Sequence, residues 1–188
     1  MSELKIVKIG DPVLRKRAVK VNNFGPELQR LIDDMAETMA AAKGVGLAAP
    51  QVGRGLRVFV ARLDEDPEGD GLMDPNLGKL HVVINPEIKR ASDEMVEGVE
   101  GCLSIPGYVG DVMRHEAITM EYQDRRGTKK RIKLKGWLAR VFQHEFDHLN
   151  GVLFVDRTEK IYEVTEGEEE NTEGAPHGEP SSPAPAEG

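Results

Sequence analysis

The segment from Gln143 to His148 places two histidines four residues apart, with a glutamate directly after the first. On a helix, positions four apart lie about 40° apart around the axis and about 6 Å apart along it. Both imidazoles, of His144 and His148, can then reach the same point, and Glu145 lies one step round from them. This spacing predicts that the segment is helical and that it supplies two ligands to a divalent metal ion.

The glutamate within this pair indicates a site that performs chemistry. A bound divalent ion makes hydroxide available at neutral pH, and a carboxylate at the position of Glu145 can move the protons. Structural zinc sites have four protein ligands and reserve no carboxylate. The segment therefore predicts a metal-dependent hydrolase. The alternative is a metal-stabilised binding protein without activity, which would not need Glu145.

Strands and helices are segregated along the chain. Apolar residues at three- and four-residue steps predict a helix over residues 26–43, and helical periodicity returns over residues 136–150. Residues 64–79 have the composition of a surface loop. Alternating and β-branched stretches predict strands, of which the last two form a hairpin, at residues 56–61, 81–85, 117–122 and 131–134. We expect an α+β fold with antiparallel strands packed around a central metal-binding helix.

Composition favours one catalytic domain followed by an acidic tail. The 188 residues suit a single core. Residues 163–188 contain eight glutamates and no lysine or arginine, so the rest of the chain is formally neutral and a general attraction to nucleic acid is not expected. From about residue 165 no large apolar residue occurs, and we expect disorder there. We place the domain at residues 1–162 and the tail at residues 163–188.

The chain is expected to be a cytoplasmic monomer. Its N-terminus has no apolar run of signal-peptide length, and no stretch approaches the roughly 18 apolar residues of a membrane span. Cys102 is the single cysteine, which rules out an intramolecular disulfide and suits a reducing compartment.

The third metal ligand has several candidates. In one extended zincin pattern it is a further histidine, but Phe154 occupies that position here. A zincin-type metallopeptidase would otherwise need a glutamate such as Glu163 or one from Glu166 to Glu170, at the edge of the tail. Cys102 is the better candidate, because a set of one cysteine and two histidines leaves one coordination position open, as catalytic sites do. Two alternative roles of Cys102 remain: it could be an inert buried residue, or a nucleophile with one of the histidines as its base.

Three motifs, in this order, resemble those of the peptide deformylases. They are the glycine loop GVGLAAPQ that ends at Gln51, the run EGCLS around Cys102, and HEFDH. The stretches 11–15 and 150–156 are also similar to the family, so that the resemblance covers roughly residues 5–160. It implies an enzyme that removes the formyl group from the N-terminal methionine of newly made proteins.

The resemblance also implies residue roles. Glu145 would act as general base and then as general acid. The side-chain amide of Gln51 and the backbone N–H of Leu103 would donate to the formyl oxygen as negative charge develops on it. The metal would be ferrous iron, with zinc, nickel or cobalt as substitutes, held by Cys102, His144 and His148.

The substrate implied by the resemblance is an N-formylmethionyl nascent peptide. Its main chain would pair like a strand beside Gly46 and Gly101. Because main-chain hydrogen bonds do not depend on side chains, many residues could follow the methionine. Contact with the ribosome is a property of some relatives, but nothing basic and helical follows the domain here. The methionine side chain would enter a pocket formed by the glycine loop and the metal helix, with Val45, Gly46, Trp137, Leu138, Val141 and His144.

Two further expectations concern charged side chains. Arg140 stands where some relatives carry an apolar residue, and we expect it to face solvent. Glu100 and Arg114 are expected to pair and to steady the loop that carries Cys102. The segment 107–109 lacks an arginine that some family members place near the substrate.

Overall fold

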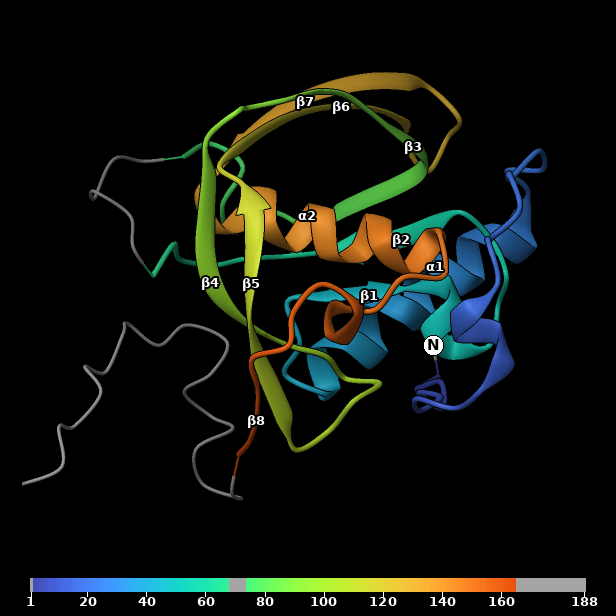
Figure 1. The fold of residues 1–188 in the computed structure, drawn as a ribbon. Coiled ribbons are helices and arrows are strands. Elements are labelled where there is room, and N and C mark those ends of the chain that lie inside the picture. Colours follow the sequence, from blue (N-terminus) through green and yellow to red (C-terminus); the bar gives the residue numbers. More distant parts are fainter. Residues whose placement is uncertain (1, 68–73, 165–188) are drawn as a thin grey trace, which may run out of the picture.

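Two antiparallel sheets enclose a central helix in the computed structural model, which describes residues 2–67 and 74–164 (Figure 1). The helix α2 (Gly136–Leu149) runs through the middle, β4 and β5 cross one side of it, and β6 and β7 arch over another. The larger sheet contains, in spatial order, β1 (Gly46–Ala48), β2 (Val58–Ala61), β3 (His81–Ala91), β6 (Ala117–Gln123) and β7 (Lys129–Lys135). The smaller sheet contains β4 (Met95–Gly101), β5 (Tyr108–His115) and β8 (Ile161–Glu163). The expected α+β fold around this helix is confirmed.

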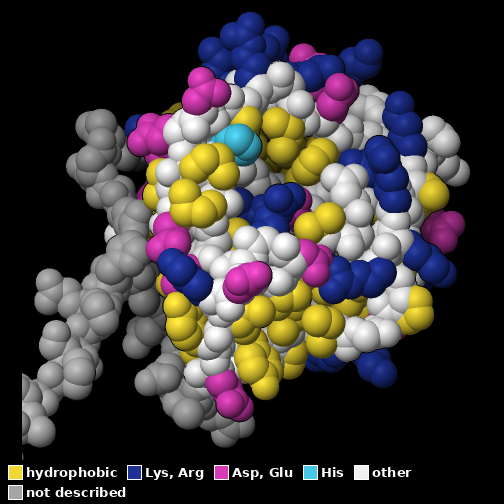
Figure 2. Space-filling model, in the orientation of Figure 1, with side chains coloured by type: hydrophobic (Ala, Val, Ile, Leu, Met, Phe, Trp, Pro, Cys, Tyr) yellow, Lys and Arg dark blue, Asp and Glu magenta, His cyan; other side chains and the backbone are white. Residues whose placement is uncertain are grey.

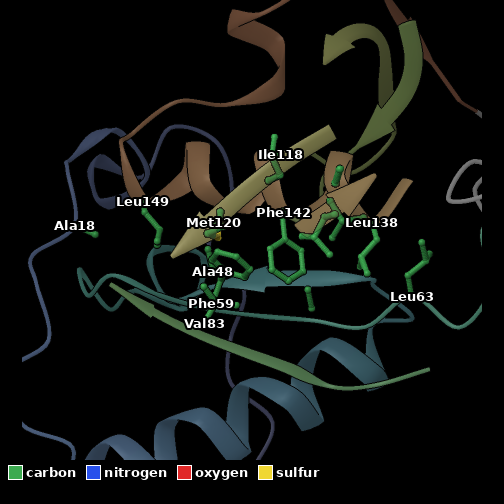
Figure 3. Packing of buried hydrophobic residues seen from close by; sticks show 14 residues of the cluster. Ala18, Ala48, Phe59, Leu63, Val83, Ile118, Met120, Leu138, Phe142 and Leu149 are labelled. Atoms are coloured by element: carbon green, nitrogen blue, oxygen red, sulfur yellow. The ribbon is translucent and has the colours of Figure 1, made fainter. Parts of the chain in front are cut away.

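Helix α2 is buried on most of its surface because both sheets pack against it. Figure 3 shows Leu138, Phe142 and Leu149 pointing from the helix toward Phe59 and its neighbours. The rings of Phe59 and Phe142 meet edge to face with centroids 5.2 Å apart. This packing holds the helix at a fixed distance from the sheet. Its polar side chains must therefore find partners inside the protein.

Helix α1 (Pro26–Ala41) packs its apolar stripe against β1 and β2. It ends two residues before the expected position, because Lys43 takes a left-handed backbone with φ of 55°. The Lys43 N–H donates to Ala40 O and the Gly44 N–H donates to Met39 O. This pair of bonds is a Schellman motif, which stops the helix and turns the chain into the glycine loop.

The β4–β5 hairpin was not predicted from the sequence, because glutamates and glycines interrupt any apolar alternation there. The two strands pair in continuous register from Met95 with His115 to Gly101 with Val109. Cys102 follows β4 directly, so this hairpin decides where the thiol lies. The strand β3 is also longer than expected and continues past Asn85, whose φ of 51° accompanies a register shift.

Short 3-10 turns complete the fold: η1 (Pro12–Arg15), η2 (Ala49–Val52) and η3 (Phe154–Asp156). Glu163 pairs with Tyr108 at the end of β8, and the Val164 N–H donates to Gly107 O. The expected disorder concerns residues 165–188, which lie outside the described residues, as do residues 68–73 of the expected surface loop. No helix in the described part of the chain is long and apolar enough to cross a membrane.

Positive charge is concentrated on one strand although the described part of the chain is close to neutral. Figure 2 shows lysine and arginine side chains gathered at the top of the molecule, where Figure 1 places β7. The exposed basic residues of β7 are Lys129, Lys130, Arg131, Lys133 and Lys135.

Candidate active site

The predicted metal ligands converge at the inner face of α2. Cys102, His144 and His148 each offer one ligand atom, and these atoms lie within 4.8 Å of one another. The Nε2 atoms of the two histidines are 3.2 Å apart, and the Cys102 Sγ lies 3.4 Å from the His148 Nε2. The cysteine comes from the end of β4 and the histidines from consecutive turns of the helix.

These separations fit a tetrahedral ion. Bonds of about 2.05 Å to nitrogen and about 2.3 Å to sulfur place two nitrogens about 3.3 Å apart and a nitrogen and a sulfur about 3.6 Å apart. The observed 3.2 Å and 3.4 Å agree with both values. The His148 Nδ1 is buried and has no hydrogen-bond partner within the described residues, so the other ring nitrogen is the one directed at the cluster. The donor set therefore fits one transition-metal ion.

Glu100 orients the first histidine. The Nδ1 of His144 lies 2.9 Å from a carboxylate oxygen of Glu100, so that Nδ1 carries the proton and Nε2 is left for a metal. Burial alone would raise the pKa of Glu100, but hydrogen bonds from Arg114 and His144 hold it well below its usual range. The carboxylate is thus charged and acts as an acceptor.

The two histidines have opposite pKa shifts in the absence of an ion. Burial lowers the pKa of His144, but hydrogen bonds with Cys102 and Glu100 outweigh it and raise this pKa well above the ordinary value. Burial, and then the positive charges of His144 and Arg114, lower the pKa of His148. Cys102 and Glu100 thus favour a proton on His144, whereas the positive charges of His144 and Arg114 disfavour one on His148.

The expected pair of Glu100 and Arg114 is present and is part of a larger buried network. Arg114 donates to the two oxygens of Glu100 over 2.7 and 2.9 Å and to Asp147 over 2.6 Å. Asp147 also accepts two hydrogen bonds from Arg157. The network joins β4, β5, α2 and the segment after η3, and so ties the elements that carry the thiol and the imidazoles.

The expectation that Arg140 faces solvent is wrong. Its side chain is 7% exposed, and its Nη1 donates to Glu100 over 3.0 Å and to Val112 O over 2.7 Å. Its Nη2 donates to Val96 O over 2.7 Å. Because sheets cover α2 on several sides, the Arg140 side chain is buried. The β4–β5 hairpin supplies the hydrogen-bond acceptors for its guanidinium.

Gln51 aims an amide donor at the cluster. It is 1% exposed, and its Oε1 accepts the Ala48 N–H over 2.8 Å, which fixes the orientation of the amide. Its Nε2 therefore points toward the Cys102 Sγ at 3.5 Å and the Ser104 Oγ at 3.3 Å. Ser104, fully buried, was missed from the sequence although it belongs to the EGCLS motif. The carbonyl of Leu103 accepts from the Lys8 side chain over 2.7 Å.

Glu145 is 3% exposed and packs against the glycine loop. A Cβ atom at Gly46 would come within 2.7 Å of the Glu145 Cδ, so only glycine leaves room for this carboxylate. This close approach is the physical reason for the second glycine of the loop.

A cavity of about 60 Å³ opens beside the cluster. The predicted pocket residues Val45, Gly46, Gly101, Trp137, Val141 and His144 line it, as do Gln51, Leu103 and Glu145. The structure does not bring Leu138 to this cavity. That residue is 1% exposed and belongs to the buried core cluster, because one step along a helix from Trp137 turns about 100°.

The fold and the site together are those of a metal-dependent hydrolase, in which one cysteine and two histidines could hold a single ion. The family model for polypeptide deformylase matches residues 3–163. The chain belongs to this family and removes the N-formyl group from the formylmethionine of newly synthesised proteins, releasing formate. Its substrates are N-formylmethionyl peptides, which excludes the zincin-type metallopeptidase and the inactive binding protein.

Individual relatives agree with this assignment. A curated peptide deformylase from Symbiobacterium thermophilum is 49% identical over 173 residues, covering 92% of this chain and 75% of the relative. The crystal structure of peptide deformylase from Thermotoga maritima is 44% identical with a TM-score of 0.74, covering 84% and 98% of the two chains. A peptide deformylase from Synechococcus elongatus, solved in complex with actinonin, is 42% identical with a TM-score of 0.74, covering 85% and 81%.

Proposed function

We propose that Cys102, His144 and His148 hold one ferrous ion, for which zinc, nickel or cobalt can substitute. The agreement of the ligand separations with tetrahedral coordination supports a single ion at these three residues. The choice of iron rests on the family to which the chain belongs. Ligand softness does not separate iron from zinc, because a thiolate with two imidazoles suits both. When bound, the ion lowers the pKa of a coordinated water and so makes hydroxide available at neutral pH.

The metal is tested by loading the metal-free protein with each ion under exclusion of oxygen. Formate release per bound ion should be highest with ferrous iron, and exposure to air should inactivate that form faster than the nickel form. Equal or higher activity per ion with zinc would contradict the assignment of iron. The variant Cys102→Ala should bind no ion tightly, while Arg131→Ala, exposed on β7, should bind as the parent does.

Glu145 is proposed to move protons between water and the departing amine. It lies inside the catalytic cavity, is almost fully buried, and is held next to the glycine loop. A carboxylate in this position accepts a proton from the attacking water and returns it to the nitrogen that leaves. The variant Glu145→Gln should keep its metal and lose formate release.

Gln51 and Leu103 are proposed to stabilise the negative charge that develops on the formyl oxygen. The orientation of the Gln51 amide supports this role, because its oxygen is occupied by a backbone N–H and its nitrogen is directed at the cluster. The second donor would be the Leu103 backbone N–H, next to the cysteine. Donors that are in place before the reaction cost no reorganisation when the charge forms.

The peptide is proposed to lie between two strand edges. Strand β1 ends the five-stranded sheet and β4 ends the three-stranded sheet. Gly46 on β1 and Gly101 on β4 both line the cavity. Main-chain hydrogen bonds to such edges are independent of side chains, so one site can process many sequences. The methionine side chain would enter the cavity beside Val141 and Trp137.

The decisive assay is release of formate from a formyl-Met-Ala-Ser peptide by the iron-loaded protein, beside Cys102→Ala and Glu145→Gln. Activity in the parent alone supports the roles of both residues. Full activity in either variant would refute the role of that residue. Actinonin, bound by the Synechococcus elongatus relative, is proposed to compete with the peptide here as well, and undiminished formate release at saturating actinonin would contradict this.

The protein is further proposed to be a cytoplasmic monomer with its catalytic unit in residues 1–162 and an acidic tail in residues 163–188, of which the part after Val164 is dispensable. A chain ending after Val164, which keeps β8 complete, should retain formate release and elute as a monomer. Transient contact with the ribosome is proposed to use the exposed lysines of β7. Cosedimentation with ribosomes at low salt should be lost when these lysines are replaced by glutamate.

A further inference from the structure

Two cavities meet at one pair of side chains. The catalytic cavity has a volume of about 60 Å³. A second cavity of about 780 Å³ lies between the start of β4, the end of β5, the end of β7 and the segment 74–77. Among the described residues, only Trp137 and Arg140 line both cavities. These two side chains, called here the partition, lie between the catalytic cavity and the much larger one.

The partition is held firmly from the side of the smaller sheet. The guanidinium of Arg140 donates to Val96 O and Val112 O, each over 2.7 Å, and to a Glu100 oxygen over 3.0 Å. Its Cζ lies 5.3 Å from the centre of the Trp137 ring, at cation–π distance. A buried arginine with charge-assisted bonds to backbone and carboxylate has little freedom to move.

Gly98 leaves the space that the guanidinium occupies. A Cβ atom at this position would lie 2.7 Å from the Arg140 Cζ and 2.8 Å from its Nε. The guanidinium can move away from such a Cβ only by giving up some of its hydrogen bonds to two carbonyls and to Glu100. The glycine on β4 and the arginine on α2 therefore form a matched pair beside the catalytic cavity, which Arg140 lines.

We propose that the partition determines specificity: Arg140, stacked on Trp137, closes the inner end of the pocket and limits the length of the side chain that the formylated residue can insert. This inference rests on the proposed function, in which the methionine side chain enters the catalytic cavity. A side chain of methionine length fits before the partition, and a longer straight chain meets the guanidinium. Without Arg140 the two cavities join, and the longer chain can continue into the larger one.

The proposal is tested by competition between two formyl peptides in one reaction. One begins with methionine and the other with 2-aminodecanoic acid, a straight chain longer than methionine, and both continue with Ala-Ser. The ratio of their kcat/KM values does not depend on the fraction of protein that is folded or loaded with metal. In Arg140→Ala this ratio should shift toward the longer residue by about tenfold or more, since one methylene is worth roughly 10- to 200-fold. Arg131→Ala, on the exposed strand, should leave it unchanged.

An unchanged ratio in Arg140→Ala, together with a lower rate for both peptides, would overturn the proposal and leave Arg140 as a structural clamp. Failure of the parent to release formate from either peptide would instead refute the proposed function itself, so the two failures are distinct.

Gly98→Ala supplies an independent test that keeps the arginine. The added methyl should press the guanidinium into the pocket and raise KM for the formylmethionyl peptide by about fivefold, an effect of the size expected for coupled neighbours. In Arg140→Ala the same change should have little effect on KM, because the clash is gone. An equal effect of Gly98→Ala in both backgrounds would show that the two residues do not form the pair inferred here.

Discussion

Replacement of Arg114 by methionine removes the central cation of the buried network while keeping a long side chain in its place. Arg114 is 4% exposed and donates two bonds to Glu100 and one to Asp147. Removal of one partner from a buried ion pair destabilises a protein by about 3–5 kcal/mol. The lower end applies here, because Glu100 keeps its bond from Arg140 and Asp147 keeps those from Arg157.

The expected loss of about 3 kcal/mol corresponds to a fall in Tm of about 6–12 °C for a protein of this size. It should be measured by thermal unfolding of the metal-free protein, so that ion binding does not contribute. Metal affinity, measured by competition with a chelator, should also fall by roughly 10- to 100-fold, since the carboxylate that orients His144 is less firmly held.

The matched control is Arg131→Met on β7, whose side chain is 55% exposed and lies 3.8 Å from Glu121. Exposed pairs of this kind contribute about 0–1 kcal/mol, so its Tm should stay close to that of the parent. The stabilising role of the network would be refuted if the free energy of unfolding of Arg114→Met lay within about 1 kcal/mol of the parent's and its metal affinity were unchanged. The buried network would then not stabilise the protein or the metal site.

Three further predictions concern single residues. Gln51→Leu should reduce kcat by about 10²- to 10³-fold with KM nearly unchanged, because a preorganised donor is lost; a change confined to KM would refute the donor role. Gly46→Ala should displace Glu145 and lower kcat/KM on the order of 10²-fold while metal content stays complete, and normal kinetics would contradict the close approach. Burial would raise the pKa of Asp156, but hydrogen bonds from Arg15 and a backbone N–H outweigh burial and lower this pKa. The ionised carboxylate therefore adds to the free energy of unfolding above its ordinary pKa, and this contribution is lost as the pH falls through the lowered pKa. The free energy of unfolding should be measured at about pH 6 and at about pH 3 for both proteins. Its decrease between the two pH values should be smaller in Asp156→Asn than in the parent, by a fraction of 1 kcal/mol because the pair with Arg15 is partly exposed.

Sequence reasoning reached the cluster of candidate metal ligands because the relevant geometry is local. The spacing of His144 and His148 follows from the helix period alone, and Glu145 comes with it. Cys102 was identified by the open coordination position that its thiol leaves and by resemblance to a family. The spacing of strands and helices was sufficient for the α+β class, although the residues of the β4–β5 hairpin gave no alternating signal.

Tertiary structure decided which α2 side chains are buried and which line the cavity, because their contacts are with residues far away in the sequence. Arg140 was expected to face solvent, but the β4–β5 hairpin supplies two carbonyls that accept from it, 28 and 44 residues earlier in the chain. Leu138 follows Trp137 in sequence, yet the packing of α2 turns it into the core and leaves Trp137 on the cavity. The sequence by itself determined the metal helix and the class of metal-dependent hydrolase, because these follow from short spacings and side-chain chemistry. The deformylase reaction came from the resemblance of three motifs to a family. The shape of the pocket was decided by long-range contacts that no local pattern records.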